Sequence, residues 1–406
     1  MKILNFGSCN IDFVYSVNHI VSAGETEQTD SMNIFPGGKG LNQSVALARA
    51  GAKTAHAGCI GKDGEMLAKL MADNGIDISY LKTVDTRNGH AIIQVSCDGE
   101  NSILVYPGSN SMITEEFIDS VLADFGKGDI ILLQNEINGI DAIINKAYKK
   151  GMCIVLNPSP CNETIRKLPL EQVSYLILNE GESEMLSGYA EPETSLKYFT
   201  EKYPEMKIVL TLGKNGAVFR DKSTEIFQPA FCTETVDTTA AGDTFTGYFI
   251  AEIARNTDYA RALKIAAAAA AIAVSRKGAA PSVPMRSEVY DKIDSMSEYK
   301  SDGKSENIRQ KIDSYTENKL KNSTAKELAE ILGYSSAHTQ SLVKKLYGAP
   351  LSKLAQDKCC RAAMQMLKET DLSIGEIINN IGYENESFFR KIFKQKYGKN
   401  MSEYRK

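Results

Sequence analysis

Residues 235–245 read TVDTTAAGDTF, and an apolar run that we expect to be helical follows them as far as Ile253. Small side chains at the start of a helix let backbone N–H groups approach a phosphate, and the helix dipole favours negative charge there. Asp243 at that helix start can accept the proton of an attacking hydroxyl, while the amides of Ala241 and Gly242 stabilise the transferred phosphoryl group. Taken alone, the stretch also suits a helix that an aspartate caps and small residues pack tightly.

Short apolar runs alternate with amphipathic or alanine-rich segments from residue 1 to about 285. The strand candidates are Ile130–Gln134, Cys153–Asn157, Tyr175–Asn179 and Ile208–Leu212. This alternation predicts an α/β fold with a mostly parallel central sheet, helices on both faces and ligands at the carboxyl ends of the strands. Residues 13–34 and 90–106 alternate in polarity instead, which predicts hairpins that form a small β lid.

The charge of the chain is unevenly distributed. Residues 304–406 carry 19 lysines and arginines against 12 aspartates and glutamates, whereas the whole chain has a net charge of −4. An acidic body with a basic tail indicates a small-molecule unit joined to a nucleic-acid unit, although a basic surface alone is often only a solvated face. The sequence has no run of about eighteen apolar residues, no signal-peptide pattern and no C-x-x-C pair among its eight cysteines. We therefore expect a cytoplasmic protein with reduced thiols and no membrane contact.

Residues 237–245 and a second glycine-rich stretch, FPGGKGLNQ at residues 35–43, resemble the two signatures of the ribokinase, or PfkB, family of carbohydrate kinases. The resemblance extends over about residues 2–290. It implies an enzyme that uses ATP to phosphorylate a sugar hydroxyl, with Asp243 as base and an anion hole at Ala241 and Gly242. D-Ribose, converted to ribose 5-phosphate, is the expected substrate. Another sugar or a nucleoside remains open, because only the shape of the pocket separates these substrates.

The same resemblance implies the binding residues. Glycines let backbone approach a ligand, amides and ammonium groups donate to hydroxyls, and buried carboxylates accept from them. The sugar would be bound by Asn10, Asp12, Gly38, Lys39, Gly40, Asn42, Glu136 and Asp243. ATP would be bound by Asn179, Thr211, Gly213, Gly216 and Gly242, with Glu182 acting on Mg²⁺ through water. Two positions depart from the family pattern, Leu41 and Ala267, and the first is expected to reshape the sugar pocket.

A monovalent cation, K⁺, is a further feature of the family and is expected beside the anion hole. The matching positions are Asp237, Thr239, Ala273, Arg276, Gly278 and Ser282. Most of them would act through backbone oxygens, which suit a hard cation. The ion would shape the loop that carries Asp243.

An internal repeat follows near the end of the chain. Residues 324–334, TAKELAEILGY, match residues 373–383, SIGEIINNIGY, at an offset of 49. Each copy has the pattern of a capping box, Thr324 with Glu327 and Ser373 with Glu376, and then a Gly-Tyr turn. This order predicts two helix-turn-helix units, although any packed pair of helices needs a similar start and turn.

Residues 307–406 resemble the AraC-type DNA-binding domain, which carries two such units. The resemblance implies recognition helices at about 336–345 and 386–396 that enter successive major grooves of double-stranded DNA. The expected base contacts are His338, Gln340, Glu386 and Arg390, and the expected phosphate contacts include Lys344 and Lys391. Phe388, Phe389 and Phe393 are predicted to lie in the core, because they recur at helical spacing.

The predicted organisation is a ribokinase-like domain at 1–294, a polar linker at 295–306 and a DNA-binding domain at 307–406. Two functions suit it. The protein is either a sugar kinase coupled to a DNA-binding tail, or a sugar-sensing transcription regulator with little kinase activity. A homodimer is expected, because lid sheets of the first family often pair and AraC-type regulators often bind paired sites.

Overall fold

The computed structural model describes residues 1–98, 100–299, 303–347, 349–383 and 385–405. It divides into two compact units, Met1–Tyr299 and Lys300–Lys406. Among the described residues, no helix is both long enough and apolar enough to cross a membrane.

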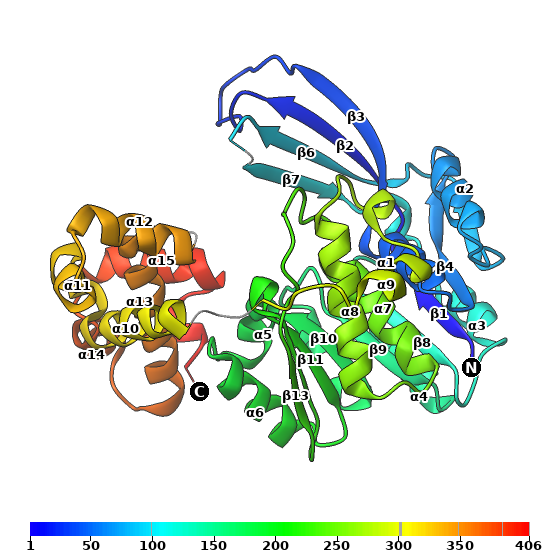
Figure 1. The fold of residues 1–406 in the computed structure, drawn as a ribbon. Helices are drawn as coiled ribbons and strands as arrows, with labels where there is room; N and C mark the ends of the chain where they lie inside the picture. Colours follow the sequence, from blue (N-terminus) through cyan, green and yellow to red (C-terminus); the bar gives the residue numbers. More distant parts are fainter. Residues whose placement is uncertain (99, 300–302, 348, 384, 406) are drawn as a thin grey trace. The chain divides into compact units, whose positions relative to one another are not determined.

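The first unit alternates strands and helices along the chain (Figure 1). Its strands are β1 (Ile3–Phe6), β2 (Asn10–Val17), β3 (Ser31–Gly37), β4 (Thr54–Gly61), β5 (Leu81–Val84), β6 (Gly89–Ser96), β7 (Asn101–Tyr106), β8 (Ile130–Gln134), β9 (Cys153–Asn157), β10 (Tyr175–Asn179), β11 (Lys207–Thr211), β12 (Ala217–Arg220) and β13 (Glu225–Gln228). Its α-helices are α1 (Lys39–Arg49), α2 (Glu65–Asp73), α3 (Glu115–Leu122), α4 (Ile140–Lys149), α5 (Glu180–Ser187), α6 (Pro192–Lys202), α7 (Ala241–Ala254), α8 (Tyr259–Val274) and α9 (Arg286–Lys292).

The main sheet of this unit has the strand order β13-β12-β11-β10-β9-β8-β1-β4-β5. Its strands pair in parallel from β11 to β5, and β12 and β13 add antiparallel pairs at one edge. Three of the four predicted strands, β8, β9 and β10, have the expected ends, and β11 lies one residue earlier than predicted. The predicted mostly parallel α/β sheet is therefore confirmed.

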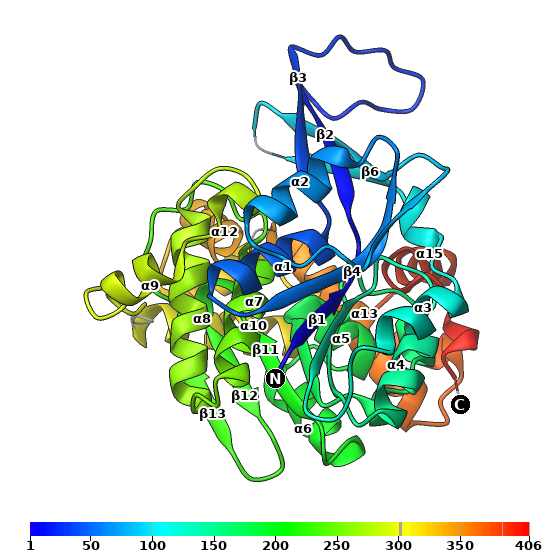
Figure 2. The ribbon, with the colours of Figure 1, turned by 90° about the vertical axis from the view of Figure 1, so that its right-hand side faces the viewer.

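Successive side chains of the central strands enter two separate cores, because side chains alternate between the faces of a sheet. Ile130 and Leu132 of β8 pack with residues of α1, α7 and α8 on one face. Ile131 and Leu133 pack with residues of α3, α4 and α6 on the other. Helices consequently cover both faces (Figure 2). Because both faces of each central strand are buried, successive residues are apolar, and the strand appears in the sequence as a continuous apolar run.

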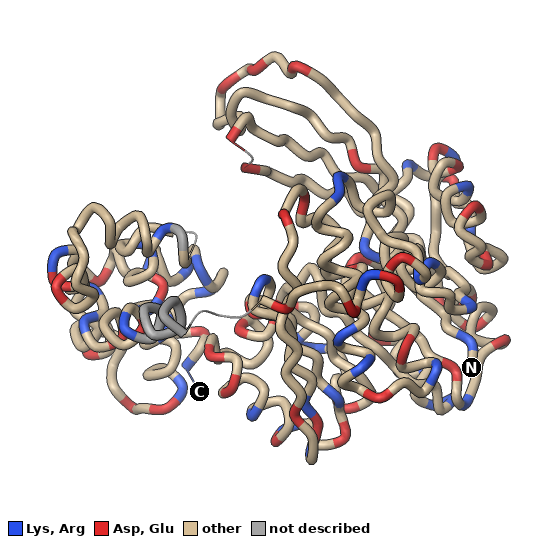
Figure 3. Tube along the Cα trace, viewed as in Figure 1, with Lys and Arg blue, Asp and Glu red and all other residues tan. Residues whose placement is uncertain are grey.

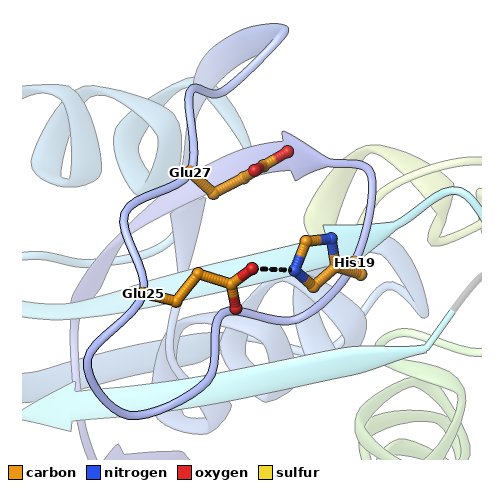
Figure 4. Close-up of side chains that lie close together, drawn as sticks. All are labelled: His19, Glu25 and Glu27. Atoms are coloured by element: carbon orange, nitrogen blue, oxygen red, sulfur yellow. Dashed lines mark hydrogen bonds and ion pairs between the residues drawn. The ribbon is translucent and has the colours of Figure 1, made fainter.

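A second, smaller sheet has the order β3-β2-β6-β7 (Figure 1). Its antiparallel pairs, β2 with β3 and β6 with β7, are the two predicted hairpins, and β2 joins them by pairing in parallel with β6. In the loop between β2 and β3, His19 Nε2 lies 2.6 Å from Glu25 Oε1, with Glu27 nearby (Figure 4). The hydrogen bond that the His19 imidazole donates to the Glu25 carboxylate raises the pKa of this exposed histidine.

The second unit consists of helices alone in its described part. They are α10 (Gly303–Lys319), α11 (Ala325–Leu332), α12 (Ser336–Tyr347), α13 (Leu351–Glu369), α14 (Ile374–Asn380) and α15 (Glu386–Tyr397). The N-terminal part of α13 packs with α10, α11 and α12, and its later residues pack with α14 and α15. The Nζ of the buried Lys358 of α13 lies 2.7 Å from Asp313 Oδ1 and 2.6 Å from Glu317 Oε1 of α10, so α13 is held to α10 by charge as well as by packing.

The capping prediction holds in full for the second repeat and in half for the first. Ser373 and Glu376 form a reciprocal capping box at the start of α14. Thr324 accepts from the Glu327 backbone N–H, but the Glu327 carboxylate accepts from the Tyr315 hydroxyl at 2.9 Å instead of reaching back. The tyrosine of α10 has therefore replaced one arm of the predicted box.

The predicted linker, residues 295–306, is shorter than expected at both ends. Ser297 accepts from the Cys232 backbone N–H at 2.8 Å, and the Tyr299 N–H donates to Ala230 at 2.6 Å, so residues as far as 299 belong to the first unit. Helix α10 begins at Gly303. Residues 300–302 lie outside the described part of the chain. Polar composition placed the first of these ends too early, because a short backbone-paired segment needs no apolar side chains.

Candidate functional site

Asp243 lies in the first turn of α7 and is buried. The residue before the helix, Ala240, has φ of 57°, an unusual value for a residue with a side chain, so backbone strain is held at this turn. Among the described residues, no hydrogen bond occupies the N–H groups of Gly242 and Asp243, whereas the Ala241 N–H lies 3.3 Å from the Thr238 carbonyl oxygen. The open amides at this helix start are therefore those of Gly242 and Asp243, with Ala241 partly engaged.

Two amide side chains hold the Asp243 carboxylate. Asn42 Nδ2 donates to Oδ2 at 3.1 Å, and Gln43 Nε2 donates to Oδ1 at 2.9 Å. Gln43 Oε1 in turn accepts from Gln134 Nε2 at 2.7 Å, which also donates to Asn5. Asn42 was predicted from the sequence as a site residue, whereas Gln43 and Gln134 were not. Gln43 stands next to Asn42 in the glycine-rich stretch, and that adjacency is the signal that could have found it.

A second carboxylate, that of Glu136, lies just beyond β8 and binds the first residue of α1. Its Oε2 accepts from the Ser8 hydroxyl at 2.5 Å and from the Lys39 backbone N–H at 2.9 Å. Burial raises the pKa of Glu136, although these two partners partly oppose that effect. Ser8 was not predicted. Since Ser8 Oγ also accepts from the Gly40 N–H at 3.1 Å, the amides at the start of α1 are already used, and this helix start is not a second anion hole.

The predicted sugar-site glycines allow close backbone packing. A Cβ on Gly40 would lie 2.3 Å from the Ser8 nitrogen, and Gly38, with φ of 90°, directly precedes α1. These glycines bring the start of α1 against the end of β1. Leu41 is fully buried in the core around α1, so its side chain packs the helix.

Asn10 and Asp12 lie on β2, at the junction of the two sheets. Asn10 Oδ1 accepts from Asn110 Nδ2 at 2.7 Å, and Asn10 is buried. Asp12 lies against Gly37, where a Cβ would meet its carboxylate at 2.0 Å. Burial, followed by repulsion from Glu136, raises the pKa of Asp12 to about 7. The two carboxylates thus form a desolvated acceptor pair that suits the hydroxyl groups of a polyol.

The raised pKa of Asp12 predicts a pH-dependent stability. Below about pH 4 the Asp12 carboxyl is protonated in both the folded and the unfolded protein. As pH rises from about 4 to about 7, Asp12 is ionised in the unfolded protein but still protonated in the folded one. The free energy of unfolding therefore falls over this range, because the ionised carboxylate is destabilised only in the folded state. Asparagine does not titrate in this range. We therefore expect the free energy of unfolding of Asp12→Asn, relative to that of the native chain, to be roughly 2–4 kcal/mol higher at pH 8 than at pH 5. Thermal unfolding at both pH values, with the exposed Asp30→Asn as control, checks this. An equal difference in Tm at the two pH values would contradict it.

The predicted nucleotide residues line one cavity of about 720 Å³ in the first unit. Its lining includes Asn179, Glu182, Thr211, Gly213, Gly216 and Gly242, together with Lys39, Ala241, Asp243 and the departing residue Ala267. The other predicted sugar residues do not line this cavity. They connect to it through Asp243, which Asn42 contacts, and through Lys39, whose backbone N–H binds Glu136. The two predicted half-sites therefore meet at Lys39 and Asp243.

The charges around Lys39, where the two predicted half-sites meet, favour its protonated, positively charged form. Burial lowers the pKa of Lys39, but attraction to Asp243, Glu136 and Glu182 outweighs that effect, and the net pKa is raised. Glu182 and Asn179 form a reciprocal capping box at the start of α5, with bonds of 2.9 and 3.0 Å. This box orients Glu182 toward the cavity and leaves the amide group of Asn179 as a donor.

The predicted cation positions are brought together in part. Asp237 accepts from the backbone N–H groups of Thr239 and Gly278, each at 2.9 Å, and therefore joins two loops beside the start of α7. Burial raises the pKa of Asp237, but these bonds outweigh it and the net pKa is lowered. Ala273 accepts from the Arg276 N–H at 3.0 Å, the Arg276 side chain pairs with Glu288, and Ser282 is buried. Carboxylate and backbone oxygens are ligands that fit K⁺, whereas the side chain of Arg276 is committed to an ion pair.

The second candidate site is the pair of helices α12 and α15 in the second unit, where charges of both signs are distributed along the chain (Figure 3). The predicted DNA contacts on α12, His338, Gln340 and Lys344, are exposed, as are Glu386, Arg390 and Lys391 on α15. Arg390 and Glu386 form an ion pair, with 3.1 Å between a guanidinium nitrogen and a carboxylate oxygen. For either residue to contact a base, this ion pair must break, or the two side chains must contact the DNA together.

One prediction for α15 was wrong. Phe389 and Phe393 are fully buried as predicted, but Phe388 is 53% exposed. Successive residues on a helix are rotated by about 100°, so Phe388 lies outside the stripe that Phe389 and Phe393 share. Its ring lies 6.4 Å from that of Tyr383, between ring centroids.

Comparison with known proteins supports both units. Residues 1–286 match the model of the pfkB family of carbohydrate kinases, and residues 328–406 match that of a helix-turn-helix domain of the AraC type. The chain is 37% identical over 295 residues to the ribokinase of Haemophilus influenzae, an alignment that covers 70% of this chain and 96% of that protein.

Two solved structures have the same fold as the first unit. Ribokinase from Cryptococcus neoformans, in complex with ADP, is 32% identical with a TM-score of 0.64, covering 72% of this chain and 99% of that one. Ribokinase from Arabidopsis thaliana, complexed with ribose and ATP, is 27% identical with a TM-score of 0.66, covering 72% and 98%. With its fold, its site and these likenesses in agreement, this chain belongs to the pfkB family of carbohydrate kinases and carries a C-terminal AraC-type helix-turn-helix domain.

Proposed function

We propose that the first unit is an ATP-dependent ribokinase that converts D-ribose to ribose 5-phosphate. The observation that carries this proposal is the position of Asp243, which two amides hold at the border between the nucleotide cavity and the carboxylates of the predicted sugar site. The similarity to ribokinases, one of them complexed with ribose and ATP, supports ribose over other sugars.

In the proposed reaction, Asp243 accepts the proton of the sugar hydroxyl while the hydroxyl oxygen attacks the γ-phosphorus of ATP. The bond from that phosphorus to the β-γ bridging oxygen breaks, and ADP leaves with its electron pair. Charge that develops on the transferred group is stabilised by the N–H groups at the start of α7 and by Lys39. Asp12 and Glu136 would orient the sugar by accepting from its other hydroxyls, and Asn10 by donating from its Nδ2 group, since its Oδ1 already accepts from Asn110.

Two ions are part of this proposal. Mg²⁺ bound to ATP would neutralise phosphate charge, with Glu182 of the α5 capping box acting through water. K⁺ would be bound between the loops that Asp237 joins, at Asp237, Thr239, Ala273, Gly278 and Ser282, and it would stabilise the loop that leads to Asp243. The side chain of Arg276 pairs with Glu288, so only its backbone would contribute.

ATP turnover over a panel of pentoses, hexoses and nucleosides, with and without K⁺, tests this function. We expect turnover with ribose and faster turnover when K⁺ is present. Turnover with a nucleoside or hexose alone would overturn the ribose assignment, and no turnover with any acceptor would overturn the kinase assignment.

We further propose that the second unit binds double-stranded DNA through α12 and α15. If Lys391 contacts phosphate, Lys391→Ala weakens binding about equally for all sequences and lowers the slope of log affinity against log salt by about one. Lys353→Ala on α13, outside the two helices, should leave that slope unchanged. Electrophoretic shift or anisotropy assays at several salt concentrations measure both. An unchanged slope for Lys391→Ala would remove this residue from the interface.

The helix-turn-helix domain also favours a second candidate function, a transcription regulator that senses a sugar. Coupling of this kind requires that ribose or ATP change the affinity for DNA, because only a differential affinity shifts an equilibrium. A DNA affinity that ribose, ATP and ribose 5-phosphate all leave unchanged at fixed salt would reject coupling without affecting the kinase proposal.

A homodimer through the small sheet completes the proposal. Its edge strands expose Ile34 on β3, and Ile103 and Leu104 on β7. Exposed apolar edge strands are surfaces that pair with a second copy of a chain. Light scattering after size-exclusion chromatography should give a dimer for the native chain and a monomer for Leu104→Lys. A native monomer would reject the dimer.

A further inference from the structure

The lining of the nucleotide cavity includes both charged and apolar residues. The charged ones are Lys39, Glu182 and Asp243, the groups that suit phosphates. The apolar lining comes from Ala267, Ala270, Ala271 and Val274 of α8, and from Phe231, Cys232 and Tyr299. A ligand that contacts both sets joins a charged group to an apolar one. This inference rests on the proposed function, under which that ligand is ATP.

Tyr299 is an aromatic residue of this lining that was not predicted from the sequence as a site residue. Residues 297–299 pair with residues 230–232 as a short antiparallel bridge: Cys232 N–H donates to Ser297, Tyr299 N–H donates to Ala230, and Phe231 is bridged to Glu298. Gln228 Nε2 also donates to Glu298 Oε1 at 3.3 Å. The backbone of Tyr299 is thus tied to residues that themselves line the cavity.

The side chain of Tyr299 has the properties of a ligand contact. It lines the cavity but remains 38% exposed, so the protein alone does not bury it. A half-exposed aromatic ring beside an apolar pocket gains buried area when a flat ring stacks on it. Tyr299 also lies beyond residue 286, where the match to the carbohydrate kinase family ends, and it is the last residue of the first unit.

We propose that Tyr299 is a base contact of the nucleotide site, stacking on the purine ring from the segment that leads directly into the second unit. Its ring, rather than its hydroxyl, provides the contact. The purine would then contact both α8 and Tyr299, the last residue of the first unit.

The absence of tryptophan from the sequence permits a direct test with the full chain. Tyr299→Trp places a single tryptophan at the proposed contact, and Tyr148→Trp, at an exposed position on α4 that does not line the cavity, is the matched control. Titration with ADP should change the emission of the first variant and not of the second, whereas ribose alone should change neither.

Calorimetry with ADP provides the second readout. Tyr299→Ala should weaken ADP binding roughly tenfold, and Tyr299→Phe should bind as tightly as the native chain, because stacking depends on the ring. Native binding of ADP together with an unresponsive Tyr299→Trp and an unweakened Tyr299→Ala would overturn the inference alone. No binding of ADP to the native chain would instead overturn the proposed nucleotide site, and this contact with it.

Discussion

Asp243→Asn is expected to lower kcat by at least about 10³-fold, since the asparagine amide cannot accept the proton of the sugar hydroxyl. Nucleotide binding should persist, because the backbone amides of α7 and the cavity lining remain. ADP calorimetry beside steady-state turnover separates these effects. Retention of more than a tenth of the native kcat would remove Asp243 from the role of base.

The same substitution should cost some stability, for a reason visible in the hydrogen bonds. Asn42 and Gln43 each donate to one carboxylate oxygen of Asp243. Asparagine offers one oxygen and one NH₂ group, so one of the two donors meets another donor. We expect a loss of about 1 kcal/mol, or a few degrees in Tm. Asp30→Asn, an exposed change, should alter neither kcat nor Tm.

Two glycines of α7 are expected to respond to substitution in opposite ways. A Cβ on Gly242 meets no atom within 4 Å, and this residue lines the nucleotide cavity. Gly242→Val should therefore fold normally, but its side chain would stand before the open amides of the helix start. We expect kcat/KM for ATP to fall about 10²-fold with little change in Tm, as when a donor to a developing anion is lost.

Gly247, one turn further along the same helix, is the matched comparison. A Cβ there would lie 2.4 Å from the Cβ of Ala46 on α1 and 2.9 Å from the Leu47 nitrogen. Gly247→Ala gains about 1 kcal/mol of helix propensity, but separating α1 from α7 costs more, and we expect a net loss of about 2 kcal/mol. Thermal unfolding and turnover are measured for both variants, so that the effect of each substitution on stability is separated from its effect on activity. A destabilised Gly242→Val with normal kinetics would reject the anion-hole assignment.

These variants matter together because α1 and α7 carry the groups that meet at the Asp243 carboxylate. Asn42 and Gln43 come from the first five residues of α1, and Asp243 comes from the first turn of α7. The close approach that Gly247 permits sets the distance between the helices that carry these groups. A packing change that leaves every site residue in place can therefore still lower activity.

Sequence patterns predicted the architecture well where neighbouring residues alone determine the local structure. The apolar runs at β8, β9 and β10 were predicted with the correct ends, because strands buried on both faces need apolar residues in both registers. The two hairpins of the small sheet followed from alternation, and the helix starts at Ser373 and Asp243 followed from capping and small-residue patterns. The two family signatures then pointed to Asn42 and Asp243, and the wider family resemblance pointed to Glu136, far apart in the chain.

Local patterns were less reliable where a side chain faces a partner that is distant in sequence. Glu327 carries the capping pattern but bonds with Tyr315 of the preceding helix. Phe388 shares the apolar character of Phe389 and Phe393, yet it is exposed because the helical period turns it away from the core. Residues 297–299 look like linker and are instead paired with residues 230–232.

The sequence by itself determined the α/β class, the tandem helix-turn-helix repeat and the chemical types at the site, because these depend on periodicity and on motifs within a few residues. Only the tertiary structure decided which amides hold Asp243, why Asp12 has a pKa near 7 and why Tyr299 lines the nucleotide cavity. Each of these depends on burial and on contacts between residues up to about two hundred positions apart. Desolvation and hydrogen-bond geometry arise from the packed arrangement of several elements, and no local pattern encodes them.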